Sequence, residues 1–409
     1  MKSLWYKKNC SLPVMVLAAA FSMLISCAVD TDDEKDVSGK YDYLYESARI
    51  TDTPLWPKYP DLTCFNFIYP SVDPYGNPAM LSGTITMGPE VKPGVKATGL
   101  ILYNHFTIYM NEECPSSGDL MVQNMVITSL PGSGFITVSP DYWGFGSTSD
   151  KHQAYCIGSA NARAAVDALL AAKKILREMG YIWDDSRLLN VGYSQGGQTA
   201  IAVSKLLDTS YSDINLSRTF AGAGPYDIPE TYRVYLNTDI TDTPSNVVNV
   251  LLAYNEYCSL NIPLSDIFKE PLLSHIDEWL YSKAYGRSEV DQYIGSTKLS
   301  DFLTPDVLNP ESEVYNKIYE AMEKENLCKG WTPRRDRGYF LVHNTIDGTV
   351  PVENTKSLIE FLKQKGVTDV ETVVDNMGSI AGALSTHEVG SLYLISGIMD
   401  WYKKEISSI

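Results

Sequence analysis

A serine flanked by glycines lies near the middle of the chain, where Gly192, Ser194 and Gly196 form the pattern G-x-S-x-G. The apolar residues just before it predict a short buried strand, and the residues from Gln195 onward predict a helix. A serine in so sharp a turn needs neighbours with almost no side chain. The helix would aim its N-terminal amides and the positive end of its dipole at the serine oxygen, which suits a nucleophile and an oxyanion. A random chain of this length carries the pattern about once in seven cases, and a glycine-rich turn into a helix explains it equally well, so the context must decide.

An acid and a base for this serine are expected beyond the carboxyl ends of later strands, where open α/β sheets bind their ligands. Asp347 follows a predicted strand in the sequence H-N-T-I-D-G-T-V-P. Taken alone, it would be interpreted as a turn or helix-capping residue, and Asp227 after an earlier strand is the alternative acid. His387 immediately precedes the final predicted helix. The order Ser194, Asp347, His387 predicts a catalytic triad.

The other four histidines have weaker claims to be the base. His105 ends a predicted strand, and His343 lies within one, so we interpret His343 as a packed core residue. His152 falls in a loop and His275 in a helical region. None of them occupies the position directly before the last helix.

Apolar runs that alternate with helical patterns predict the fold class, an α/β fold with a mostly parallel, doubly wound sheet. A hairpin is expected at 61–89. Further strands and helices are expected at 97–106, 134–141, 158–180, 187–207, 218–224, 338–344, 369–374 and 388–404.

One block interrupts this alternation. Residues 228–336 are mostly helical in pattern and separate two strands that otherwise belong side by side. We predict a core formed by 46–227 and 337–409, with 228–336 as a helical cap or lid over the carboxyl ends of the strands. A purely structural insertion is the alternative.

These motifs together resemble the α/β-hydrolases, and among them the secretory lipase group. The resemblance covers about residues 60–405. It rests on the elbow at 192–197, the Asp347 loop, S-P-D-Y-W-G-F-G-S at 139–147, G-A-G-P-Y-D at 222–227 and W-T-P at 331–333. It implies the α/β-hydrolase fold and hydrolysis of carboxylic esters without a cofactor or a metal.

The resemblance also implies a role for each site residue. Ser194 would attack the acyl carbon, His387 would carry the proton and Asp347 would orient the imidazole. Gln195 would give one oxyanion amide. The second amide would come from Phe106 or Thr107, where this chain departs from the family's usual His-Gly.

The resemblance also suggests a place for two aromatic residues of the 139–147 motif. Tyr142 and Trp143 would line the floor of the substrate pocket, and packing beneath the sheet is the equal alternative.

The N-terminus predicts export and lipidation. Residues 1–26 join a basic start to an apolar run too short to remain as a membrane span, which predicts a signal peptide. The sequence L-I-S-C ending at Cys27 resembles a bacterial lipobox, which implies lipidation of Cys27, and an ordinary signal peptide is the alternative. Residues 27–45 then predict a flexible acidic tether. The expected location is the outer membrane of a Gram-negative bacterium, with the lipid anchor as the membrane contact.

Charge and cysteine content exclude other classes. The formal net charge is -17, and loss of the three lysines in 1–26 makes it -20, so the chain is a poor partner for nucleic acid. Five cysteines remain after Cys27, with no metal-ligand spacing. Either two disulfides or none would fit. The sequence leaves the oligomeric state open.

Two other functions agree with part of the sequence. A serine peptidase of the prolyl-oligopeptidase kind shares the triad order, but residues 28–180 hold too few strands for its propeller. A lipoprotein that binds glycan or lipid without chemistry is the second, although a pure binder has no need of an ordered triad.

Overall fold

The structure is a computed structural model that describes residues 39–52, 62–117, 134–381 and 383–406. The expected signal peptide, Cys27 and the tether as far as residue 38 lie outside the described residues. The residues from Gly39 to Ile409 form one compact unit.

In the described part of the chain, nine strands form the main sheet, in the order β1-β2-β3-β6-β5-β8-β9-β10-β11. The first four pair antiparallel, and the run from β6 to β11 is parallel. The strands are Arg49–Asp52, Thr63–Val72, Pro78–Met87, Phe135–Pro140, Gly99–Asn104, Leu188–Tyr193, Arg218–Gly222, Gly338–Asn344 and Val370–Asp375, in spatial order. The predicted mostly parallel sheet is confirmed.

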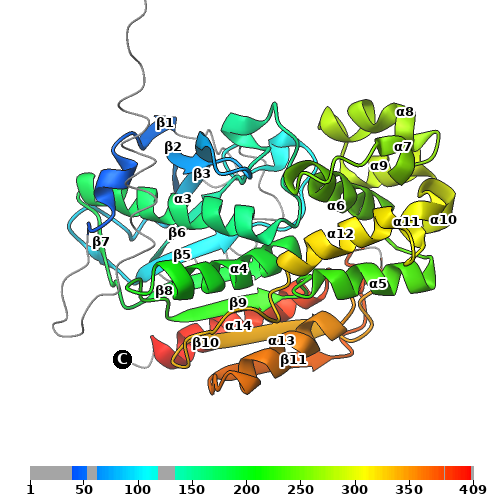
Figure 1. Ribbon diagram of the computed structural model, residues 1–409. Helices are drawn as coiled ribbons and strands as arrows, with labels where there is room; N and C mark the ends of the chain where they lie inside the picture. Colours follow the sequence, from blue (N-terminus) through cyan, green and yellow to red (C-terminus); the bar gives the residue numbers. More distant parts are fainter. Residues whose placement is uncertain (1–38, 53–61, 118–133, 382, 407–409) are drawn as a thin grey trace, which may run out of the picture. The chain divides into compact units, whose positions relative to one another are not determined.

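The central strands are apolar on both faces because both faces are covered. Leu100 and Leu102 of β5 pack into one hydrophobic cluster, and Ile101 and Tyr103, which point the other way, pack into a second. The first cluster holds side chains of α3, α4 and α13, and the second holds Leu394 and its neighbours on α14. Helices therefore cover both faces of the sheet (Figure 1).

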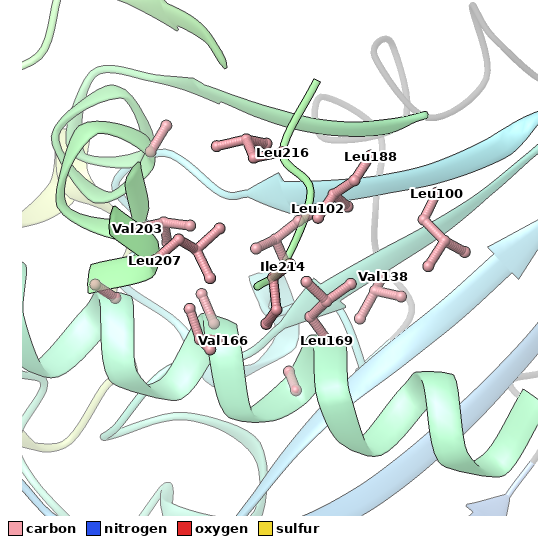
Figure 2. Packing of buried hydrophobic residues seen from close by; sticks show 14 of the residues in the cluster. Leu100, Leu102, Val138, Val166, Leu169, Leu188, Val203, Leu207, Ile214 and Leu216 are labelled. Carbon is pink, nitrogen blue, oxygen red and sulfur yellow. The ribbon is translucent and has the colours of Figure 1, made fainter. Parts of the chain in front are cut away.

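Three of the large helices, α3, α4 and α14, lie where the sequence predicted helices, and α13 follows the acid loop. Helices α3 and α4 lie side by side over the sheet. Figure 2 shows Leu169 of α3 beside Val138 of β6 and Val166 of α3 on the side of Leu207 of α4, within one hydrophobic cluster. The bounds are Gly158–Glu178 for α3, Gln195–Ser210 for α4, Glu353–Gln364 for α13 and Gly390–Glu405 for α14. These helices fix the strand ends that carry the candidate site.

Residues 228–336 form a helical layer with its own core. Among its helices, α6 and α12 contribute the largest sets of buried side chains, and loop residues Tyr109 and 154–157 join the same cluster. Figure 1 shows these helices, green to yellow, gathered on one side of the sheet. The bounds from α5 to α12 are Ile228–Thr238, Pro244–Tyr257, Leu264–Ile267, Leu272–Ile276, Arg287–Ile294, Leu299–Phe302, Pro305–Leu308 and Glu313–Lys324, with a π-helical turn, η5, at Asp277–Tyr281.

The tether prediction is wrong at its C-terminal end. The turn η1 (Asp42–Tyr45) packs on the domain, and the hydroxyl of Tyr45, which is 2% exposed, donates to buried Asp167. The residues before Tyr45 are acidic and polar, so the sequence pattern did not indicate that Tyr45 would be buried. A small second sheet, β4 (Lys96–Ala97) with β7 (Ile182–Trp183), was also not predicted, since two residues give no periodic pattern.

Candidate active site

Ser194 occupies a strained turn between β8 and α4. Its backbone has φ 58° and ψ -124°, a region that residues with a side chain rarely adopt. The glycines make this turn possible, because a Cβ at Gly192 would lie 2.0 Å from the carbonyl oxygen of Gly196. A Cβ at Gly196 would lie 2.1 Å from the carbonyl oxygen of Asn104. The predicted strand, turn and helix around the serine are confirmed.

Three side chains from distant parts of the chain meet at this turn. The Nε2 atom of His387 lies 2.8 Å from the Oγ atom of Ser194. On the other side of the ring, Nδ1 lies 2.7 Å from Oδ2 of Asp347. Since a carboxylate only accepts hydrogen bonds, Nδ1 carries the proton and Nε2 is free to accept the serine proton.

Asp347 is held as a carboxylate. Burial by itself would raise the pKa of Asp347, but attraction to His387 and hydrogen bonds from His343 and His387 outweigh burial and hold the pKa well below its usual range. Its Oδ1 accepts the backbone N–H groups of Thr349 and Val350, at 2.8 and 2.9 Å. The group is therefore ionised and fixed in place before any substrate arrives.

His343 contacts the acid loop from within the core. Its Nε2 atom lies 2.9 Å from the carbonyl oxygen of Val350 and 3.3 Å from Oδ2 of Asp347. Both are acceptors, so Nε2 carries a proton, and Nδ1 accepts from the hydroxyl of Thr355 at 2.6 Å. The histidine is fully buried, as predicted, and it also lies against Asp347. The sequence interpretation missed this contact because residues four apart are neighbours on a helix and not along a strand.

The proposed oxyanion residues lie around Ser194. Gln195 is the first residue of α4, so its N–H has no acceptor within the helix. Phe106 and Thr107 line the same cavity as Ser194 and His387. The hydroxyl of Thr107 is 2.8 Å from that of Tyr155, which fixes this loop beside the serine.

The assignment of Tyr142 and Trp143 to the pocket is wrong. Tyr142 is 1% exposed and stacks on His105, with ring centroids 4.1 Å apart. Trp143 donates its Nε1–H to the hydroxyl of Tyr257 at 3.0 Å. Neither lines a described cavity that contains Ser194. Tyr142 packs beneath the site, which is the alternative that the sequence left open, and the half-buried Trp143 packs against the helical layer.

The remaining acid and histidine candidates lie elsewhere. Asp227 accepts from Asn326 at 2.8 Å and lines a cavity that does not include Ser194. His105 is buried against the backbone carbonyl groups of Phe106 and Asp141, and burial lowers its pKa to about 4. Two others, His152 and His275, contact Glu256 and Trp279 respectively.

Ser194 opens into two cavities. One of about 60 Å³ is lined mainly by apolar side chains of α5 and α6, together with Gln195 and Met322. The other, of about 480 Å³, includes His387, the Phe106 loop and residues of α9 and α14. The predicted cap region, 228–336, contributes α5, α6 and α9 to these walls. Its individual lining residues could not be chosen from the sequence, because only the packing of the helical layer brings them beside Ser194.

Metal ligands, disulfides and membrane spans would each bear on what the described part of the chain can do. Among the described residues, no group of three His, Cys, Asp or Glu side chains could hold a metal ion. The five cysteines of the described part are free thiols, so the alternative without disulfides holds there. No helix in the part of the chain that the structure describes is long and apolar enough to cross a bilayer.

The sheet order, the strained serine turn and the contact chain through His387 define the α/β-hydrolase fold. A sequence model of the secretory lipase family matches residues 116–405. The chain therefore belongs to the secretory lipase family, a family of carboxylic-ester hydrolases. Lipase 5 of Candida albicans is 26% identical over 330 residues, a match that covers 75% of this chain and 65% of that protein's length.

Solved structures agree on the fold. The rice cell wall degrading esterase LipA from Xanthomonas oryzae superposes with a TM-score of 0.70 at 19% identity, over 89% of this chain and 98% of that one. Candida antarctica lipase A in its closed state gives a TM-score of 0.60 at 14% identity, over 92% and 87% of the two chains. At such identities the likeness is one of fold.

Proposed function

We propose that the protein hydrolyses carboxylic esters through an acyl-enzyme, with Ser194 as nucleophile, His387 as base and Asp347 as the orienting acid. The observation that carries this proposal is the pair of contacts made by His387, at 2.8 Å to Ser194 and 2.7 Å to Asp347. Family membership supports the reaction class.

Each step uses a group already in position. Ser194 Oγ bonds to the acyl carbon while its proton moves to Nε2 of His387, and the oxyanion faces the N–H of Gln195 and an amide of the Phe106–Thr107 loop. The carbon–oxygen bond to the alcohol then breaks, and Nε2 returns the proton to the departing alkoxide. Water repeats the sequence on the acyl-enzyme and releases the acid.

The test is the Ser194→Ala variant, assayed with a short-chain aryl ester. We expect kcat to fall by about four to six orders of magnitude, with a circular dichroism spectrum and melting temperature close to those of the wild type. Turnover near the wild-type rate in the folded variant would overturn the proposal. Hydrolysis of aminoacyl-arylamides at a rate comparable to esters would favour a peptidase instead.

We also propose that the mature protein is a lipoprotein. The L-I-S-C sequence ending at Cys27 and the following acidic segment support lipidation of Cys27 and attachment to the outer membrane of a Gram-negative bacterium. Its membrane contact is then the lipid, since the net charge of -20 after cleavage opposes binding to anionic headgroups.

A further inference from the structure

The two cavities at Ser194 can be assigned to the two halves of an ester. The departing alkoxide takes its proton from Nε2 of His387, so the alcohol must lie on the side that His387 faces. His387 lines the 480 Å³ cavity and is absent from the lining of the 60 Å³ cavity. The acyl chain therefore continues past Ser194 and Gln195 into the smaller one.

The smaller cavity has room for few carbon atoms. An apolar protein cavity of about 150 Å³ holds one benzene molecule, and this cavity has about 60 Å³. On that scale an acyl chain of roughly two to four carbons fills it. The cavity for the alcohol is many times larger, at about 480 Å³.

The walls of the smaller cavity are rigid. Leu251 of α6 and Met322 of α12 are 0% and 1% exposed, within the hydrophobic cluster of the helical layer. Tyr232 of α5 is fixed by its hydroxyl, which donates to the carbonyl of Val307 at 3.0 Å. Close-packed side chains of this kind leave no space for a longer chain without repacking.

The larger cavity is amphipathic. Its apolar part includes Leu392 and Ile395 of α14, and Arg287, Glu289 and Glu388 add charge. The guanidinium of Arg287 lies 3.5 Å from the carboxylate of Glu388, so donors and acceptors occur together. Such a lining suits a bulky alcohol that carries both apolar surface and hydroxyl groups.

We propose that this protein selects esters that join a short acyl group, of about two to four carbons, to a bulky hydroxylated alcohol. The inference rests on the proposed ester hydrolysis at Ser194. A long-chain lipid ester would not fit this site, because the smaller cavity limits the length of the acyl chain while the larger cavity leaves room for the alcohol.

The direct test is a series of p-nitrophenyl esters with acyl chains from acetate to palmitate, assayed in detergent below its micellar concentration. We expect kcat/KM to be highest at acetate or butyrate and to fall by about 100-fold at octanoate and beyond. The butyryl ester of a monosaccharide should exceed ethyl butyrate in kcat/KM by about 10-fold. A palmitate ester hydrolysed as fast as the butyrate ester would overturn the inference.

The Met322→Ala variant tests whether the smaller cavity sets the limit on acyl chain length. Removing the side chain of Met322 should move the preferred acyl chain to a longer ester in the series, while Met322→Leu, which conserves volume, should keep the wild-type order. If Met322→Ala does not fold, Val250→Ala, at a half-buried position lining the same cavity, takes its place. An unchanged acyl order in the folded enlarged variant would overturn the assignment of the smaller cavity.

The two proposals fail in different ways. No hydrolysis of any ester above the Ser194→Ala background would contradict ester hydrolysis itself. Hydrolysis that depends on Ser194 but shows no preference for short acyl chains would contradict the size limit alone.

Discussion

At the scale of residues, the candidate site depends on one aspartate that serves two histidines. Asp347 Oδ2 accepts from His387 at 2.7 Å and lies 3.3 Å from Nε2 of His343, and its Oδ1 accepts two backbone N–H groups. The carboxylate cannot rotate without breaking several of these contacts at once. Its charge and position therefore determine which nitrogen of His387 faces Ser194.

Replacing Asp347 should separate its role from that of Asp227. Asp347→Asn removes the acceptor that fixes the His387 tautomer, so kcat on a short aryl ester should fall by roughly four orders of magnitude. Asp227→Asn is the matched control, since Asp227 contacts Asn326 and not His387, and kcat should change by less than about tenfold. The reverse ranking in steady-state kinetics would make Asp227 the catalytic acid.

The sequence predicted these residues more easily than their surroundings. Ser194, Asp347 and His387 each follow a strand or precede a helix, so chain order and strand context were enough to select them. Tyr142 could not be placed in this way, because its backbone turns to φ 66° and buries the ring against His105. Nothing in the local pattern determines whether an aromatic at such a turn faces the substrate or the core.

At the scale of elements, the helical layer is joined to the core beside the acid loop. Asn354, at the start of α13, is fully buried and accepts from the backbone N–H of Asp227 at 2.8 Å. Its amide donates to the hydroxyl of Thr231 on α5 at 2.8 Å. Tyr235 of the same helix donates to the carbonyl of Thr349, whose N–H in turn donates to Asp347.

Removing Asn354 should therefore cost stability. Asn354→Ala leaves the half-buried N–H of Asp227 without its acceptor and removes one of the two hydrogen bonds of the Thr231 hydroxyl. We expect the free energy of unfolding in urea to fall by about 1–3 kcal/mol. Asn316→Ala is the control, because this exposed side chain makes two backbone hydrogen bonds on the surface. We expect a change there of less than about 0.5 kcal/mol. Equal effects of the two substitutions would show that the Asn354 contacts do not hold α5 to the core.

The elements themselves were predictable where burial on both faces produced a continuous apolar run, or burial of one helix face produced a helical repeat. Strands β5, β6, β8, β9 and β10 are buried along their whole length, and α3 repeats apolar residues over 158–178, so their positions agree with the sequence prediction. By contrast, β1 is the polar R-I-T-D at the edge of the sheet, and a bulge shifts its pairing with β2. An edge strand lacks the two covered faces that produce a recognisable pattern.

At the scale of the whole molecule, sequence distance and spatial distance are unrelated at the site. Residues 194, 347 and 387 come together because β8, β10 and the segment before α14 end at the same edge of the sheet. The helical layer inserted between β9 and β10 then supplies most of the wall of the smaller cavity. The wall of the smaller cavity thus comes mostly from a part of the chain that contains none of Ser194, Asp347 and His387.

The N-terminal anchor gives the last prediction. When the full chain is expressed in a Gram-negative host, we expect mass spectrometry to show that the mature protein begins at Cys27 and carries lipid on its thiol and amine. Cys27→Ser should move the protein from the membrane fraction to the soluble fraction, because the net charge of -20 after cleavage opposes binding to anionic lipid. Cys10→Ser, inside the segment to be removed, is the matched control and should leave the protein in the membrane fraction. An unmodified Cys27, or a mature chain that begins at Ala28, would contradict the anchor. Esterase activity per molecule should be the same in both fractions, since the catalytic unit begins beyond the anchor, at Gly39.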